Sequence, residues 1–277
     1  MNQIIKKSFI IGSAVIIAAS LFIGCSRDSG KKVVIKGSTT VLPITQKTAE
    51  EFRKLNKVSI TIEGSGSGNG IKALIDGTCD IANSSREMKA EELQSAKDKG
   101  KTVKEIALAV DMIVPVVHSS NTVKNITMAQ LKAVYDGSIT NWKQLGGKDE
   151  NIVVISRDTS SGTYEIWHEK VMKKNDVRKD ALLQASNGAI VSAVAGNPKA
   201  LGYIGYGYID SSVKALTVDN VEIKIENGKS GKYPISRKLY MYIDENKLSA
   251  DAQKYIDFVL SAEGQALVKQ AGFIPIK

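Results

Sequence analysis

The segment VSITIEGSGSGNGIKALI, residues 58–75, is the clearest indication of the fold class. Residues 58–62 alternate apolar and polar side chains, which is typical of a β-strand with one buried face. Glycine and serine then dominate residues 64–70, after which apolar side chains return at helical spacing over 71–75. The segment therefore predicts a strand, a glycine-rich turn and a helix in direct succession.

The same succession of strand and helix recurs on both sides of this segment. Upstream, the apolar run 33–36 predicts a short buried strand, and a helix follows whose apolar face consists of Ile44, Thr48, Phe52 and Leu55. Downstream, further strands are predicted at 80–84, 106–117, 152–155, 201–206 and 239–243. Further helices are predicted at 131–135, 164–171, 189–195 and 248–259. Because strands and helices alternate in two series, we predict an α/β protein with two lobes.

A few residues carry more specific structural predictions. Thr127 is expected to cap the helix that follows it, because a threonine oxygen can accept a free N–H of the first turn. The helix at 189–195 is apolar on nearly all sides, so we expect it to be buried. Trp142 and Trp167 are interpreted as packing residues, and Cys79 as a small buried hydrophobic residue.

Composition excludes several classes of protein. With 277 residues and 43% hydrophobic residues, the chain can bury a substantial core, which excludes disordered and fibrous proteins. Two cysteines cannot build a disulfide scaffold. The net charge is +9, but the lysines are spread along the chain and no basic run is interleaved with aromatic residues. We interpret the charge as solvated faces and expect no nucleic-acid partner.

The N-terminal residues 1–24 predict a secretory signal peptide. Lys6 and Lys7 precede an uncharged apolar run over 9–23, which is short for a membrane-spanning helix. The end of this run is similar to a lipobox, although Phe22 stands where leucine is usual. This similarity implies that Cys25 carries a diacylglyceryl group, that residues 25–32 form a tether, and that the protein is anchored outside the cytoplasmic membrane.

The first of three polar loops, Gly37-Ser38-Thr39-Thr40, lies between a predicted strand and a predicted helix. Its hydroxyl groups can cap the helix. The first four N–H groups of a helix have no internal partner, so an anion can also bind there. Capping alone is the simpler interpretation of this loop when it is taken by itself.

The second polar loop is the glycine and serine run 64–70. Glycine lets the backbone approach a ligand closely and form nests that bind anions. A flexible linker is the alternative, although predicted structure adjoins the loop on both sides. The spacing fits neither a nucleotide P-loop, which requires a lysine, nor a dinucleotide-binding turn, because Ile71 takes the place of the third glycine.

The third polar loop, residues 157–163, follows the predicted strand at 152–155 and precedes the helix of Trp167. Arg157 brings a permanent charge and a fork of donors that suits a tetrahedral oxyanion. A surface arginine in a capped turn is the alternative, and the polar run 80–86 likewise fits a plain turn. Three hydroxyl-rich loops at strand-to-helix junctions together favour an anion site.

Candidates for catalysis and metal binding are few. The sequence contains two histidines, His118 and His168, which we interpret as ordinary surface or helix residues. His168 lacks the second histidine of a zinc-binding helix, and the chain has no Gly-x-Ser-x-Gly motif. We therefore predict a binding protein without enzymatic activity, cofactor or metal site.

In this order, the motifs resemble those of the phosphate-binding proteins of bacterial phosphate ABC transporters, which have the type II periplasmic-binding-protein fold. The resemblance covers roughly residues 33–277 and rests on the runs 37–40, 64–68, 80–86, 157–163, 186–188 and 202–206. It implies that a dehydrated oxyanion is held in a cleft between two lobes. The phosphate-binding residues that it implies are Ser38, Thr39, Thr40, Ser67, Ser85, Arg157, Ser161, Gly162 and Thr163.

Two positions depart from the family pattern. Members place an aspartate where this chain has Ser85, and its carboxylate accepts the proton of hydrogen phosphate and repels sulfate. Members also often place an acidic residue where this chain has Thr159, which pairs with the arginine. A hydroxyl group accepts a proton but repels nothing, so discrimination between phosphate and sulfate is expected to be weaker.

The resemblance also implies an organisation and partners. One lobe is expected to comprise residues 33–112 and 236–277, and the other residues 113–235. The protein is expected to be a monomer that captures inorganic phosphate and delivers it to an ABC permease. A receptor for another tetrahedral oxyanion such as sulfate stays an alternative, as does a secreted phosphatase.

Overall fold

The computed structural model describes residues 32–276; the predicted signal peptide 1–24 and the predicted lipidation site Cys25 lie outside them. The segment that begins this range folds as alternating strands and helices. Its elements are β1 (Lys32–Gly37), α1 (Leu42–Leu55), β2 (Ser59–Gly64), α2 (Ser67–Ile75), β3 (Ile81–Ser84) and α3 (Ala90–Asp98). Elements β2 and α2 confirm the strand, turn and helix predicted at 58–75. Strands β2, β1 and β3 are parallel neighbours.

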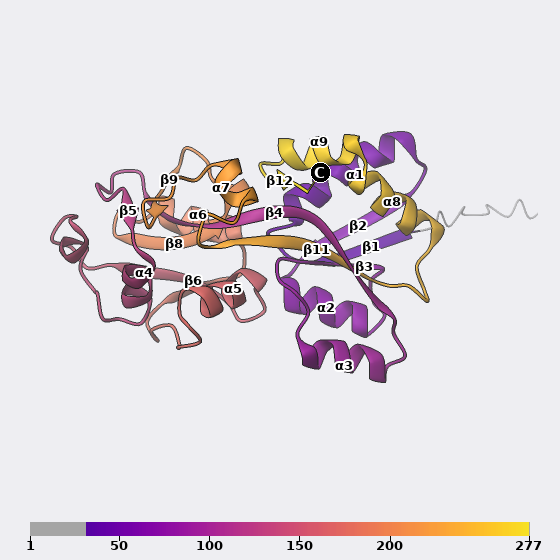
Figure 1. Cartoon of the computed structure of the whole chain (residues 1–277), viewed down its shortest axis with the longest axis horizontal. Coiled ribbons are helices and arrows are strands. Elements are labelled where there is room, and N and C mark those ends of the chain that lie inside the picture. Colours follow the sequence, from indigo (N-terminus) through magenta and orange to yellow (C-terminus); the bar gives the residue numbers. More distant parts are fainter. Residues whose placement is uncertain (1–31, 277) are drawn as a thin grey trace, which may run out of the picture.

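Two long strands connect the two halves of the molecule (Figure 1). Strand β4 (Val103–His118) is antiparallel to β11 (Ser236–Asp244), and the pair continues the sheet beyond β3. On the other side, β4 pairs with β8. The sheet order is β2-β1-β3-β11-β4-β8-β6-β7. The extended conformation predicted for 106–117, where Asp111 and Pro115 interrupt the apolar run and disfavour a helix, is therefore confirmed.

The second half repeats the alternation of strands and helices. Its elements are β5 (Asn125–Ile126), α4 (Met128–Tyr135), η1 (Trp142–Leu145), β6 (Val153–Arg157), α5 (Gly162–Lys170), β7 (Leu182–Gln184), α6 (Asn187–Ala195), β8 (Ala200–Gly205), η2 (Tyr206–Tyr208), β9 (Val213–Ala215), β10 (Thr217–Val218) and α7 (Ile225–Lys229). The chain then returns through β11 and ends with α8 (Ala250–Leu260), α9 (Ala262–Gln270) and β12 (Ile274–Pro275). An α/β architecture is thus confirmed.

The buried apolar residues form three clusters. One cluster joins residues from 112 to 235 with Ile274 and includes Trp142 and Trp167, which confirms that both tryptophans are packing residues. The other two clusters lie among residues 33–109 and 239–273. Each half of the molecule therefore has its own core, and the β4–β11 pair passes from one core to the other.

Local structure agrees with several sequence predictions and corrects three. The Thr127 hydroxyl accepts the N–H of Gln130 at 3.1 Å, as expected of an N-cap. Leu55, at the last position of α1, is 65% exposed instead of buried. Helix α6 buries one face alone, because its other side faces away from β8 and the sheet. Cys79 is only half-buried, since it follows the loop after α2 and lies at the edge of a core cluster.

Within residues 32–276, no helix combines the length and the apolar character that crossing a membrane requires.

Candidate functional site

The three polar loops meet where strands β1, β2 and β6 end. The amides of Ser65 and Gly66 donate to the carbonyl of Gly37 at 2.8 and 2.9 Å, which joins the first two loops. The amide of Gly68 donates to the carbonyl of Ser160 at 3.0 Å, which joins the second loop to the third. Helices α1, α2 and α5 therefore begin around one point, and their N-termini favour a negative charge there.

The first loop contributes two buried threonine hydroxyls. Thr39 and Thr40 are 4% and 1% exposed, and the Oγ1 atoms of Thr40 and Thr163 lie 3.0 Å apart. This contact joins the loop after β1 to the first turn of α5. The hydroxyl oxygen of Ser38 accepts a hydrogen bond from the amide of Thr40 at 3.1 Å and thereby stabilises the loop itself. Helix α1 begins after Val41 without a side-chain cap, so the predicted capping is not observed; the loop instead places two hydroxyls at the junction.

The second loop is packed on both sides, which excludes the flexible linker. Gly66 has a φ of +104°, and a Cβ atom there would lie 2.9 Å from the carbonyl oxygen of Ser160. Glycine is therefore required both by the backbone conformation and by the close approach. The Ser67 hydroxyl accepts the amide of Ser85 at 3.0 Å, and the two Oγ atoms are 3.3 Å apart. The residues after β3 thus join the same cluster.

Arg157, the last residue of β6, is 1% exposed. Its Nε donates to the carbonyl of Gln184 and its Nη2 to that of Ala185, both at 2.9 Å. The remaining nitrogen, Nη1, is buried and has no hydrogen-bond partner among the described residues. Burial lowers the pKa of this guanidinium, because the charge has lost its water. A buried, unpaired donor of this kind is costly unless an anion contacts it.

The surroundings of Arg157 differ from the prediction in one respect. Thr159, which stands at the family's acidic position, is exposed. Asp158, one residue earlier, lies 3.9 Å from Nη2 of Arg157. Its carboxylate also accepts the amide of Ser160 at 2.9 Å, which fixes the turn before α5. The partly exposed Asp158 therefore supplies a carboxylate near the arginine.

The N-terminus of α5 completes the cluster. Ser161 caps the helix, and its hydroxyl accepts the amides of Thr163 and Tyr164, both at 3.2 Å. Gly162 faces the residues of the other half: a Cβ atom there would lie 2.5 Å from Oγ of Ser67 and 2.8 Å from Oγ of Ser85. The structure thus buries all nine residues that the resemblance assigns; contacts join the three loops, whereas the Arg157 side chain binds the backbone of residues 184 and 185. The nine residues are Ser38, Thr39, Thr40, Ser67, Ser85, Arg157, Ser161, Gly162 and Thr163.

Two further buried residues, Asn187 and Arg237, contact this cluster without having been assigned a role from the sequence, and a third, Asp111, pairs with Arg237. Asn187, at the start of α6, donates from Nδ2 to the Oγ1 atoms of Thr39 and Thr40 at 3.3 and 3.1 Å. Arg237 on β11 pairs with Asp111 on β4 at 2.8 Å. Asp111 was visible as a lone charge in an apolar run, and Asn187 belongs to a family motif, but nothing local marks Arg237.

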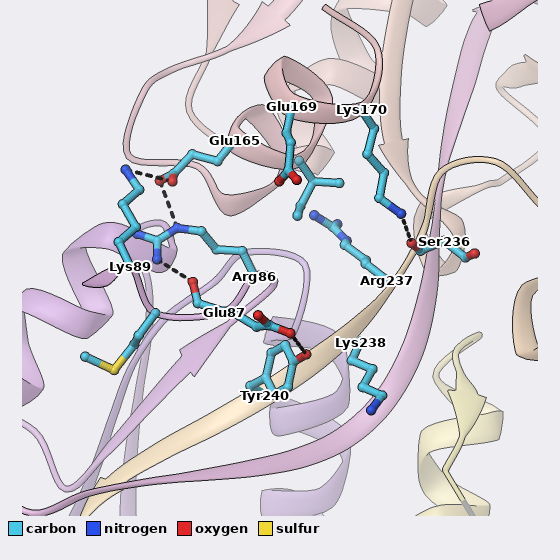
Figure 2. Close-up of a pocket in the computed structure, with 12 residues that line it drawn as sticks. Arg86, Glu87, Lys89, Glu165, Glu169, Lys170, Ser236, Arg237, Lys238 and Tyr240 are labelled. Carbon is cyan, nitrogen blue, oxygen red and sulfur yellow. Dashed lines mark hydrogen bonds and ion pairs between the residues drawn. The ribbon is translucent and has the colours of Figure 1, made fainter. Parts of the chain in front are cut away.

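A cavity of about 480 Å³ lies between the loop after β3, helix α5 and strand β11 (Figure 2). Figure 2 shows Glu165 pointing toward Arg86 and Lys89, with ion pairs of 2.9 and 2.8 Å. These pairs join residues of the two halves. Arg237, which contacts the cluster, also lines this cavity. Its side chain extends from β11 toward α5, the helix of Glu169 and Lys170 (Figure 2).

Comparisons with known proteins agree on one family. Residues 26–263 match the model of the PBP superfamily domain. The chain is 32% identical to the phosphate-binding protein PstS of Borreliella burgdorferi over 94% of this chain and 96% of that protein. It is 34% identical to the PstS protein of Staphylococcus saprophyticus, over 98% and 91% of the two chains.

Solved structures give the same result. A crystal structure from Clostridium perfringens, described as a phosphate ABC transporter substrate-binding protein with bound phosphate, superposes with a TM-score of 0.85. It shares 39% identity and covers 89% of this chain and all of its own. An ABC-type phosphate transport receptor from Vibrio cholerae gives a TM-score of 0.72 at 32% identity, over 87% of this chain and 99% of its own.

Proposed function

Because the chain belongs to the PBP superfamily and, within it, to the phosphate-binding proteins of ABC transporters, we propose a function in phosphate import. The buried polar cluster captures inorganic phosphate for an ABC importer. The observation that carries the proposal is the buried, unpaired Nη1 of Arg157, the residue at the end of β6 from which the hydroxyl-rich loop leads to the N-terminus of α5. A dehydrated oxyanion would satisfy that donor together with the amides at the start of α5.

The number of donors is adequate for tight binding. Taking an anion out of water costs several kcal/mol even after relaxation. About eight charge-assisted hydrogen bonds, at about 1.5 to 3 kcal/mol each, supply roughly 12 to 24 kcal/mol. A micromolar site requires about 8 kcal/mol net. The gross free energy of these hydrogen bonds exceeds the net binding free energy, and the excess offsets the desolvation of the ligand and the ordering of the loops.

We further propose that phosphate closes two lobes, residues 33–112 with 236–277 and residues 113–235. The separate apolar clusters support this division. The contacts between Thr40 and Thr163, and between Gly68 and Ser160, join the two parts at the cluster. A ligand held by groups from both parts stabilises the closed arrangement, with the β4–β11 pair as the connection.

The protein is proposed to bind phosphate without chemistry, as a monomer anchored through Cys25 outside the cytoplasmic membrane. The family supports an extracytoplasmic receptor for phosphate. Hydrolysis would require a nucleophile activated by a base. His118 and His168 belong to β4 and α5 and take no part in the hydrogen bonds of the cluster. Turnover of a chromogenic phosphate ester by the purified protein would contradict this part of the proposal.

Titration calorimetry of the purified protein with phosphate, arsenate and sulfate tests the proposed function. We expect saturable phosphate binding at micromolar or lower concentration, with arsenate as a competitor because it has the same shape and charge. Sulfate binding tighter than phosphate binding would favour the alternative oxyanion receptor. An absence of phosphate binding would refute the proposal.

Ser85→Asp is expected to increase discrimination against sulfate at least tenfold, measured as the ratio of the two affinities. The new carboxylate would accept the proton of hydrogen phosphate but repel sulfate, which carries no proton at neutral pH. Ser85→Ala is the control, because it removes the hydroxyl without adding a charge, and we expect the ratio to change less than threefold. If Ser85→Asp weakened both ligands equally, Ser85 would not face the anion.

A further inference from the structure

Arg237 and Asp111 form a buried ion pair at the point where the chain passes between the two halves. They lie directly opposite each other on β11 and β4. Nε and Nη2 of Arg237 donate to Oδ2 of Asp111 at 3.0 and 2.8 Å, and both side chains are at most 3% exposed. Nη1 of Arg237, like that of Arg157, is buried without a hydrogen-bond partner among the described residues, but the carboxylate of Asp111 compensates the charge of this guanidinium.

Arg237 also contacts one hydroxyl from each half. Its Nη2 lies 3.3 Å from Oγ1 of Thr40 and 3.0 Å from Oγ1 of Thr163. Because Nη2 carries two hydrogens, one can reach Asp111 while the other is shared by the two threonines. A single rigid group therefore holds the loop after β1 and the first turn of α5 at a fixed separation.

The hydrogen bonds around Thr40 determine where its hydroxyl hydrogen points. Its oxygen accepts from Nη2 of Arg237 and from Nδ2 of Asn187, at 3.3 and 3.1 Å, and a hydroxyl oxygen has two lone pairs. With both occupied, the hydrogen is directed to the nearby Oγ1 of Thr163, 3.0 Å away. Thr163 then accepts from Arg237 and Thr40, so its own hydrogen is left to donate to a ligand.

We propose that Arg237 is a positioning residue of the anion site, which orients the hydroxyl hydrogens of Thr40 and Thr163 and holds their two loops together in the closed arrangement. The proposal rests on the proposed phosphate function. It assigns strands β4 and β11 a role beyond connecting the halves, because the ion pair between Asp111 and Arg237 fixes the guanidinium that the two hydroxyls contact. Lysine cannot reproduce this role, since an ammonium group lacks the planar fork.

Arg237→Lys is therefore expected to weaken phosphate binding at least tenfold in titration calorimetry of the full chain, although the charge opposite Asp111 is kept. Lys238→Met is the matched control. Lys238 is the next residue of β11, lines the same cavity and is exposed, so its substitution removes a nearby positive charge without disturbing the hydroxyls. We expect less than a twofold effect. Equal effects of the two substitutions would overturn the proposal.

A double-mutant cycle distinguishes positioning from a general structural role. If Arg237 acts through Thr163, the loss caused by Arg237→Lys should be at least threefold smaller in a Thr163→Val background. Additive losses would overturn the proposal. If Arg237→Lys does not fold, the cycle is run with the neutral pair Asp111→Asn and Arg237→Gln, which leaves no buried charge unpaired. A wild-type chain that does not bind phosphate would refute the proposed function instead.

Discussion

Arg157→Ala is expected to weaken phosphate binding at least tenfold, and up to about a hundredfold. One hydrogen bond to a charged group contributes about 1.5 to 3 kcal/mol, and each 1.4 kcal/mol corresponds to about tenfold in affinity. The pairing of β6 with β7 and β8 is made by backbone groups, and the side chain adds its hydrogen bonds to the carbonyls of Gln184 and Ala185. The loss should therefore appear in calorimetric titration with phosphate, while circular dichroism of the free protein stays as in the wild type.

Two controls accompany this substitution. Arg178→Ala removes a guanidinium from the same half, where it pairs with Asp180 outside the cluster. Cys79→Ser changes a half-buried side chain whose thiol has its pKa raised to about 12 by burial, so it carries no charge near neutral pH. Neither should change phosphate affinity more than twofold. If either control weakened binding as much as Arg157→Ala, the assignment of Arg157 would be wrong.

Gly162→Ala is expected to weaken phosphate binding at least fivefold, and up to about a hundredfold. In the closed arrangement its Cβ would lie 2.5 Å from Oγ of Ser67, 2.8 Å from Oγ of Ser85 and 3.0 Å from Cβ of Ser67. Relieving such contacts costs about 1 to 3 kcal/mol. The contacts lie between the two halves, so the substitution destabilises the closed state and leaves the fold of each half unchanged.

Gly188→Ala is the matched control for this effect. Gly188 also lies in the first turn of a helix in the same half, but the neighbour nearest to an added Cβ would be the hydroxyl of Ser186, at 3.9 Å. We expect wild-type affinity. Small-angle scattering with saturating phosphate should show compaction for the wild type and for Gly188→Ala, but not for Gly162→Ala at the same concentration. Compaction and full affinity of Gly162→Ala would show that closure does not require this contact.

Much of the local structure could be predicted from short stretches of sequence. The alternation over 58–62, the glycine run and the helical spacing over 71–75 correspond to β2, its turn and α2. Thr127 caps α4 as its side-chain chemistry predicts. These predictions hold because strand and helix periodicity and capping are decided within about one turn or one strand.

The errors have a common physical cause. Leu55 has helical spacing but lies at the exposed end of α1, and α6 is apolar on most sides but packs on one. Hydrophobicity says which side chains favour burial, whereas the neighbouring elements decide how much surface they cover. Residues at the end of an element or on its free side therefore stay exposed in spite of their composition.

The α/β alternation and the three hydroxyl-rich loops could be predicted from the amino-acid sequence, as could, through the family resemblance, the residues expected to hold the anion. Three features required the folded molecule: the meeting of these loops, the unpaired nitrogen of Arg157, and the position of Arg237 opposite Asp111, 126 residues away in the chain, with both threonine hydroxyls in reach. The reason is that periodicity and capping act between near neighbours in the chain, whereas the pairing of buried charges and donors depends on strand register and packing between distant segments.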